Sequence, residues 1–220
     1  MKHLIDAMRR PFTDFNKLLI GIIISIIPIV NFISIGYQFR CAKTAMTGKF
    51  AMPKWENFGN LFITGILGSI ISFTYMLPAL ILLSLSLATI VDNPFEYMMV
   101  FAIHPGFISL LAENITGPVF VLFMLAITLF ALSILVSNSA LINYSNKFKF
   151  EDGFKKIVWK KAFTGKFIGT WILAVGYGFL IAIVLALIPK ILFFDIGGGI
   201  QRFLYGVTYM TALATIYKKL

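Results

Sequence analysis

Charged side chains are missing from the long apolar runs of this sequence. Four apolar runs follow Trp55, and none of them contains Asp, Glu, Lys, Arg or His between its ends. A proton relay, or a carboxylate- or metal-based centre inside a bilayer, requires such side chains. We therefore expect no catalytic residues, no metal site and no cofactor, and a protein that is not an enzyme.

Cysteine and histidine are also scarce. Cys41 is the only cysteine, so neither an intramolecular disulfide nor a cysteine-based metal site can form. His3 and His104 are the two histidines, and no HExxH pair or glycine-rich phosphate-binding motif is present. His104 is the one candidate base for a membrane enzyme acting on lipid, but its place before Pro-Gly is more typical of a turn.

Apolar residues are abundant instead. Of 220 residues, 59% are hydrophobic and 13% are charged, whereas a soluble domain carries about 25% charged residues. The formal net charge is +10, but the bases lie in short loops beside apolar runs, as in cytoplasmic flanks that face anionic headgroups. We expect a single integral membrane domain over residues 1–220, with membrane lipids and no nucleic acid as its partners.

The segment Lys147–Lys166 orients the chain, because it contains seven of the nineteen basic residues. Lysine-rich loops favour the cytoplasmic side. The connection Asp92–Gly117 has no Lys or Arg, so we expect it outside, with the C-terminus inside. Aromatic residues between the lysines indicate an amphipathic helix in the headgroup layer. The candidate contacts with anionic headgroups or a partner are Lys155, Lys156, Trp159, Lys160 and Lys161. Alternatively, the lysines of this segment make no specific contact: they lie on a solvated face and only determine which side of the membrane the segment occupies.

The predicted fold class is all-α, an integral membrane helical bundle. Four full spans are expected, over 57–91, 118–144, 167–189 and 203–217, since a span needs about 20 residues. Interfacial amphipathic helices are expected at the N-terminus and within 97–112. The three glycines at 197–199 are expected to form an outer turn.

A broken or hairpin helix is expected near the N-terminus, over Leu18–Phe39. Pro28 and Asn31 interrupt this run near its middle, so it is either one broken crossing or a hairpin that turns there. Basic residues flank it on both sides. A hairpin keeps both flanks inside, and it is the preferred reading. Asp14 or Thr13 is expected to cap the helix.

Small and polar residues mark expected contacts between helices. In the first long run, Gly65 and Gly68 share a face suited to close contact. In a later run, the small residues that predict helix packing are Gly165, Gly169, Ala174, Gly178 and Ala182. The polar residues Ser137, Asn138 and Asn143 form a candidate polar path through the membrane, although such residues more often hold helices together by hydrogen bonds.

Several short motifs carry a family resemblance. They are Ile27-Pro28-Ile29-Val30-Asn31, Gly36-Tyr37 followed by Arg40, Gly48, Pro53-x-Trp55, and Leu61-Phe62 with Gly65. In these the sequence resembles the prokaryotic, largely archaeal, multi-pass membrane family catalogued as domain of unknown function 4013. The resemblance implies a helical protein of the plasma membrane and carries over no catalytic residues.

Two main functional hypotheses follow. The first is a non-enzymatic module: a scaffold, an accessory subunit or a lipid-binding protein, with a second copy or another membrane protein as its partner. The alternative is a transporter or channel for a small or amphiphilic molecule. A membrane enzyme has the least support, because the apolar runs contain no acids or bases.

Overall fold

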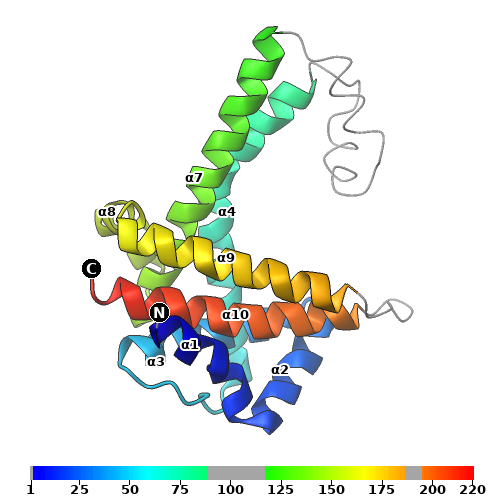
Figure 1. Ribbon diagram of the computed structural model, residues 1–220, viewed down its shortest axis with the longest axis vertical. Helices are drawn as coiled ribbons and strands as arrows, with labels where there is room; N and C mark the ends of the chain where they lie inside the picture. Colours follow the sequence, from blue (N-terminus) through cyan, green and yellow to red (C-terminus); the bar gives the residue numbers. More distant parts are fainter. Residues whose placement is uncertain (1, 89–116, 187–194) are drawn as a thin grey trace. The chain divides into compact units, whose positions relative to one another are not determined.

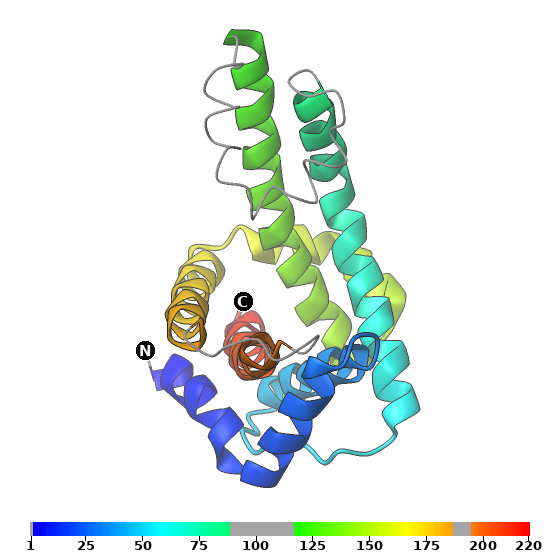
Figure 2. The same cartoon turned by 90° about the vertical axis from the view of Figure 1, so that its right-hand side faces the viewer.

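The computed structural model describes residues 2–88, 117–186 and 195–220. All regular elements in these ranges are helices, as the predicted all-α class requires (Figures 1 and 2). The expected helices within 97–112 lie outside the described residues. In chain order the elements are α1 Lys2–Arg9, the 3-10 helix η1 Arg10–Thr13, α2 Phe15–Ile26, α3 Asn31–Met46, α4 Phe58–Ala88, α7 Gly117–Lys147, the 3-10 helix η2 Phe150–Phe154, α8 Lys156–Ala162, α9 Gly165–Leu185 and α10 Ile196–Tyr217.

Three helices are long and apolar enough to cross a membrane. These are α4, α7 and α9, with mean hydropathy values of 2.1, 2.9 and 2.2 in their most apolar windows. The buried share of these windows is only 17%, 28% and 11%, as expected for helices that face lipid. The expected fourth span, α10, is not among them, and most of its residues from Phe203 onward are buried.

The chain forms two compact units, Met1–Ser72 with Asn138–Leu220, and Phe73–Ser137. The smaller unit contains the second part of α4 and the first part of α7. Pro78 lies inside α4, which continues through it as one helix, as predicted. Ala79 of α4 and Ala126 of α7 are completely buried.

The N-terminal apolar run is a helical hairpin in the larger unit. α2 ends at Ile26 and α3 begins at Asn31. The Lys17 ammonium donates to Met52 O over 3.1 Å, and the Tyr37 hydroxyl donates to Pro53 O over 2.8 Å. The start of α2 and the middle of α3 thus reach the same loop, so the chain has reversed direction between them.

Asp14 caps the first helix of this hairpin. Its side chain accepts a hydrogen bond from Lys17 N over 3.1 Å, which satisfies one of the amide groups left free at a helix start. Its carboxylate also pairs with the Lys17 ammonium at 2.8 Å. The predicted cap is therefore present.

α10 is the central helix of the larger unit, and the N-terminal elements pack along it (Figure 2). Arg10 donates to Thr211 Oγ1 over 3.0 Å, near the end of α10. Farther along the N-terminal segment, a Cβ at Gly21 would lie 2.1 Å from Phe203 Cζ. The segment from α1 to α2 therefore runs antiparallel to α10.

α3 and α9 also cover α10. Gln38 on α3 donates to Arg202 O over 3.1 Å. On α9, a Cβ at Gly178 would lie 2.5 Å from the Tyr205 ring. α9 and α10 lie side by side and run in opposite directions (Figure 1). With neighbours on several sides, α10 does not need the hydropathy of a helix that faces lipid.

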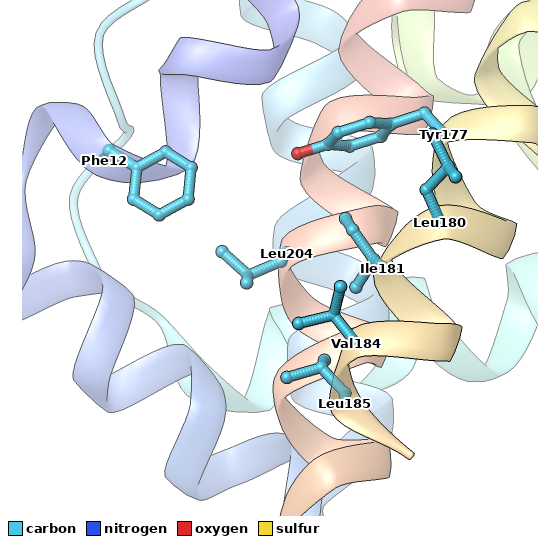
Figure 3. Close-up of a pocket in the computed structure, with 7 residues that line it drawn as sticks. All are labelled: Phe12, Tyr177, Leu180, Ile181, Val184, Leu185 and Leu204. Carbon is cyan, nitrogen blue, oxygen red and sulfur yellow. The ribbon is translucent and has the colours of Figure 1, made fainter. Parts of the chain in front are cut away.

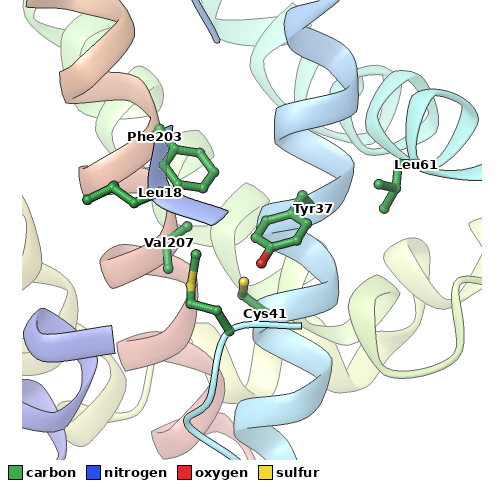
Figure 4. Packing of buried hydrophobic residues seen from close by; sticks show 7 residues of the cluster. Leu18, Tyr37, Cys41, Leu61, Phe203 and Val207 are labelled. Atoms are coloured by element: carbon green, nitrogen blue, oxygen red, sulfur yellow. The ribbon is translucent and has the colours of Figure 1, made fainter. Parts of the chain in front are cut away.

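An apolar cluster joins α2, α3, α4 and α10 (Figure 4). Burying a large apolar side chain stabilises a fold by roughly 1.5–3 kcal/mol. The Tyr37 ring also stacks on Trp55, with 3.8 Å between centroids. The buried members of the cluster are Leu18, Tyr37, Cys41, Met52, Leu61, Phe203 and Val207.

Two glycines let α3 and α4 cross at backbone contact. A Cβ at Gly36 would lie 2.0 Å from Leu61 O, and one at Gly65 would lie 1.9 Å from Phe32 O. Nearby, a Cβ at Gly68 would meet the Phe39 ring at 2.2 Å. The predicted close-contact face of Gly65 and Gly68 therefore packs against α3.

The prediction of an outer turn at the three glycines 197–199 is wrong. They belong to the first turn of α10. Asp195 caps this helix by accepting from Gly198 N over 2.8 Å, which offsets the low helix propensity of glycine. A Cβ at Gly199 would lie 2.3 Å from Ile26 Cγ1, so this glycine permits close packing on α2.

Candidate functional site

The lysine segment folds into η2 and α8, and α8 is fixed to α7. Val158 and Ala162 are completely buried. The Ser139 hydroxyl on α7 donates to Val158 O over 2.7 Å. One side of α8 is therefore held in the protein, which determines the side that faces outward.

The outward side of α8 combines aromatic, aliphatic and lysine side chains. At 3.6 residues per turn, its exposed residues fall on one continuous arc. Ile157, Trp159 and Phe163 are 40%, 51% and 48% exposed, and Lys156 and Lys160 are exposed beside them. We call this set of five residues the α8 face. The rings of Trp159 and Phe163 stack with centroids 6.5 Å apart.

The lysines named as candidate contacts differ in their surroundings. Lys155 is exposed and pairs with the buried Asp152 carboxylate, whose hydrogen bond raises the pKa of the ammonium. Lys161 is half-buried, donates to Tyr217 O over 2.9 Å and lies 4.1 Å from the centre of the Tyr217 ring. Burial lowers the pKa of Lys161. Lys161 therefore contacts the end of α10, whereas Lys156 and Lys160 belong to the α8 face.

The residues of the candidate polar path make contacts within the bundle. Asn143 Nδ2 donates to Asp152 O over 2.7 Å, which joins α7 to η2. Asn138 lies close to the Tyr209 hydroxyl on α10, and Ser137 is buried. Asn143 thus bridges two elements, and Asn138 lies at the contact with another helix. A polar path through the membrane stays a prediction.

The small residues of α9 lie on two sides of the helix. Ala174 is completely buried, and Gly178 packs against Tyr205. Ala182 is half-buried. In contrast, a Cβ at Gly165 or Gly169 would meet nothing within 4 Å. The structure therefore places Gly178 in the contact with α10, buries Ala174, and leaves Gly165 and Gly169 on an open side.

An apolar pocket of about 280 Å³ lies between η1, α9 and α10 (Figure 3). It is lined by Phe12, by Leu204 and by one side of α9 from Tyr177 to Leu185. The polar side-chain group shown in Figure 3 is the Tyr177 hydroxyl. Apart from this hydroxyl, the described lining is apolar and suits hydrocarbon.

Arg10 forms a buried cluster that the sequence did not indicate. Its side chain is completely buried, and its guanidinium donates to Cys41 O, Thr44 Oγ1, Ala51 O and Thr211 Oγ1. These acceptors belong to α3, to the loop after it and to α10. Burial lowers the pKa of Arg10. In the sequence, Arg10 is one of four charged residues near an apolar helical face, and nothing distinguishes it from Arg9.

Candidate metal ligands do not cluster in the described ranges. Among residues 2–88, 117–186 and 195–220, no group of three His, Cys, Asp or Glu is placed to hold a metal ion. His104 lies outside these ranges.

Comparison with known proteins gives the family. The model of the family described as "Protein of unknown function (DUF4013)" matches residues 19–194, which is most of the chain. The chain belongs to this family. The match confirms the resemblance seen in the sequence. The matched residues extend from α2 to the connection before α10 in this DUF4013 chain. Searches of curated proteins and of solved structures found no match.

Proposed function

We propose that this DUF4013 chain is a non-enzymatic integral membrane module that binds anionic lipid headgroups at the cytoplasmic surface. The observation that carries the proposal is the α8 face, where Trp159 and Phe163 are exposed beside Lys156 and Lys160. Aromatic rings favour the level of the headgroups. Each lysine near an anionic surface contributes about 1 kcal/mol.

The membrane setting of this proposal rests on exposed apolar helices. On α9, Ile172, Phe179 and Leu180 are more than half exposed. Unpartnered apolar surface of this extent marks a contact with lipid or with another protein. The exposed tip of the α2–α3 hairpin is also apolar, with Ile29 69% exposed, which suits a hairpin that enters the bilayer from one side.

The proposed topology has four crossings. α4, α7 and α9 supply three, and α10 supplies the fourth, since 22 residues extend about 33 Å. The hairpin, the lysine segment and the C-terminus lie on the cytoplasmic side of the plasma membrane, and Asp92–Gly117 lies outside. The distribution of lysine and arginine supports this orientation.

The transporter or channel alternative has less support from the same residues. Asn143 donates to Asp152 O, and Asn138 lies close to the Tyr209 hydroxyl. These contacts favour a role in packing over a role in a conducting path, because the amide groups lie at contacts between elements of the bundle. A lipid-binding module is therefore the better-supported function.

Fluorescence quenching by brominated lipid tests the proposal. A chain carrying Trp55→Phe and Trp171→Phe retains Trp159 as its one tryptophan. In bilayers of phosphatidylcholine and phosphatidylglycerol, bromine is placed on one lipid at a time at equal mole fraction. We expect brominated phosphatidylglycerol to quench Trp159 about twofold more strongly, because the lysines enrich anionic lipid beside it.

Matched charge removals complete the experiment. Lys156→Gln with Lys160→Gln should abolish the preference for brominated phosphatidylglycerol. Lys49→Gln with Lys54→Gln removes the same charge from exposed positions in another loop and should leave the preference intact. If the two brominated lipids quench Trp159 equally in the protein that retains Lys156 and Lys160, the result would contradict the proposed function.

A further inference from the structure

A polar cavity of about 260 Å³ lies beside α8, where α3, α7 and α10 end. Sites for drug-sized ligands occupy roughly 300–1,000 Å³, so this one suits a smaller group. No carboxylate occurs among the described residues that line it. The lining residues are Met46, Thr47, Asn143, Asn146, Lys161, Tyr217 and Lys218.

The charge in this cavity is positive on balance. Lys161 and Lys218 each contribute a full positive charge. A helix C-terminus carries roughly half a negative charge, and three helices end here. Lys147, in the last turn of α7, adds another positive charge at the same helix end. The lysines therefore outweigh the helix ends, and the cavity favours an anion.

Lys161 is held in place, and no carboxylate among the described residues pairs with it. Its ammonium donates to Tyr217 O over 2.9 Å and lies over the Tyr217 ring. Within the described part of the chain it forms no ion pair. Burial lowers its pKa, because the charged form loses water without gaining an opposite charge. An anion in the cavity supplies that opposite charge.

We propose that this cavity binds a phosphate group, carried by an anionic lipid headgroup or present as free phosphate. Lys161 and Lys218 provide the charge, and the side-chain amide of Asn146 provides a hydrogen-bond donor. For a lipid source, the inference rests on the proposed lipid-binding function and adds a defined site to it. The α8 face concentrates lipid, and the cavity holds one phosphate.

The test uses the purified full-length protein in detergent with two probes. Native mass spectrometry follows the titration with dioctanoyl phosphatidylglycerol, and calorimetry follows the titration with inorganic phosphate. We expect one saturable site. Lys218→Gln and Asn146→Leu, both at exposed positions, should each weaken binding about tenfold, as expected for a hydrogen bond to a charged group.

A variant away from the cavity provides the control. Lys156→Gln with Lys160→Gln removes two charges from the α8 face and should leave the saturable site unchanged.

Lys161 lines the cavity but is less suited to the test. Lys161→Gln should remove binding, but it also loses the contact with Tyr217 O. Circular dichroism therefore checks the fold of every variant, and the result is judged on Lys218→Gln and Asn146→Leu.

The outcomes identify the source of the phosphate or overturn the site. Saturable binding of the lipid alone assigns the headgroup, and binding of both probes assigns the phosphate group itself. Absence of a saturable site, or full binding by Lys218→Gln and Asn146→Leu, overturns the inference. The lysines then only offset the partial negative charge of the helix C-termini. Quenching of Trp159 is measured separately, so failure here leaves the proposed function standing. Failure of the quenching test leaves the site for free phosphate standing.

Discussion

The guanidinium of Arg10 donates a hydrogen bond to the carbonyl oxygen of Cys41 over a distance of 2.7 Å. Both side chains are completely buried. The same guanidinium reaches Ala51 O and Thr211 Oγ1, so one side chain joins η1 to α3, to the loop after α3 and to α10. In the described part of the chain no carboxylate pairs with it. Arg10 is held by neutral oxygen atoms.

Replacing Arg10 should destabilise the larger unit severely. Arg10→Ala leaves several buried acceptors without a donor, at about 1–3 kcal/mol each, and also leaves a cavity. We expect a loss of about 3 kcal/mol or more in the free energy of unfolding. Thermal unfolding of the detergent-solubilised protein, followed by circular dichroism, measures the change.

Arg9→Ala is the matched control for Arg10. Arg9 is the preceding residue, carries the same charge and is exposed. Its replacement should change stability by less than about 0.5 kcal/mol. If the two variants unfold at the same temperature, the buried hydrogen bonds of Arg10 do not stabilise the unit.

The crossing of α3 and α4 predicts a strong preference for glycine at Gly65. A Cβ there would lie 1.9 Å from Phe32 O, and a backbone atom cannot move aside as a flexible side chain can. Gly65→Ala should therefore destabilise the protein by about 1–3 kcal/mol.

Gly59→Ala, on the same helix, controls for the change in helix propensity. A Cβ at Gly59 would meet nothing within 4 Å, so alanine there should be neutral or stabilising by up to about 1 kcal/mol. We expect a lower unfolding temperature for Gly65→Ala and an unchanged or higher one for Gly59→Ala. A neutral Gly65→Ala would mean that α3 and α4 do not cross at backbone contact.

The cap at Asp14 predicts a pH dependence. Hydrogen bonds from the Lys17 ammonium and amide lower the pKa of Asp14 below its ordinary value of 3.8. The stabilisation is therefore complete above pH 3.8 and is lost as the pH falls through the lower, folded-state pKa. Asp14→Asn can still cap the helix but lacks the charge.

Unfolding temperatures of the natural chain and Asp14→Asn measure this effect. We expect the natural chain to be more stable at neutral pH and the difference to vanish at the acidic end. Because both side chains of the ion pair are partly exposed to solvent, added salt should also reduce the difference. A difference that is constant from pH 7 to pH 2.5 would contradict the assigned role of the carboxylate.

Features set by local sequence could be predicted, because their signals lie close together in the chain. Uninterrupted apolar runs indicated α4, α7 and α9. The hairpin followed from Pro28 and from basic residues on both sides of the run. The amphipathic character of α8 followed from aromatic residues placed between lysines.

Features set by distant partners could not be predicted. Arg10 is buried by residues 31 to 201 positions away in the sequence, and no local pattern reports such neighbours. Lys160 and Lys161 are adjacent, yet Lys161 alone reaches Tyr217 O. The three glycines before Ile200 were assigned to a turn because glycine is a weak helix former, and the packing of Gly199 on Ile26 was not visible.

Cysteine labelling tests the hairpin and the proposed orientation. Cys41 is completely buried, and a Cys41→Ala background removes it. Asn16→Cys, Lys54→Cys and Lys219→Cys place single thiols at exposed positions. A membrane-impermeant maleimide should label all three from the cytoplasmic side, and it should label Glu113→Cys only from the outside.

The hairpin and the single crossing differ in one result of this labelling. In the hairpin, the Lys17 ammonium lies 3.1 Å from Met52 O, so Asn16 and Lys54 must face the same side of the membrane. A crossing between Leu18 and Phe39 places them on opposite sides. Labelling of Asn16→Cys and Lys54→Cys from opposite sides would therefore exclude the hairpin. Labelling of all three thiols from the outside would instead reverse the proposed orientation while leaving the hairpin intact.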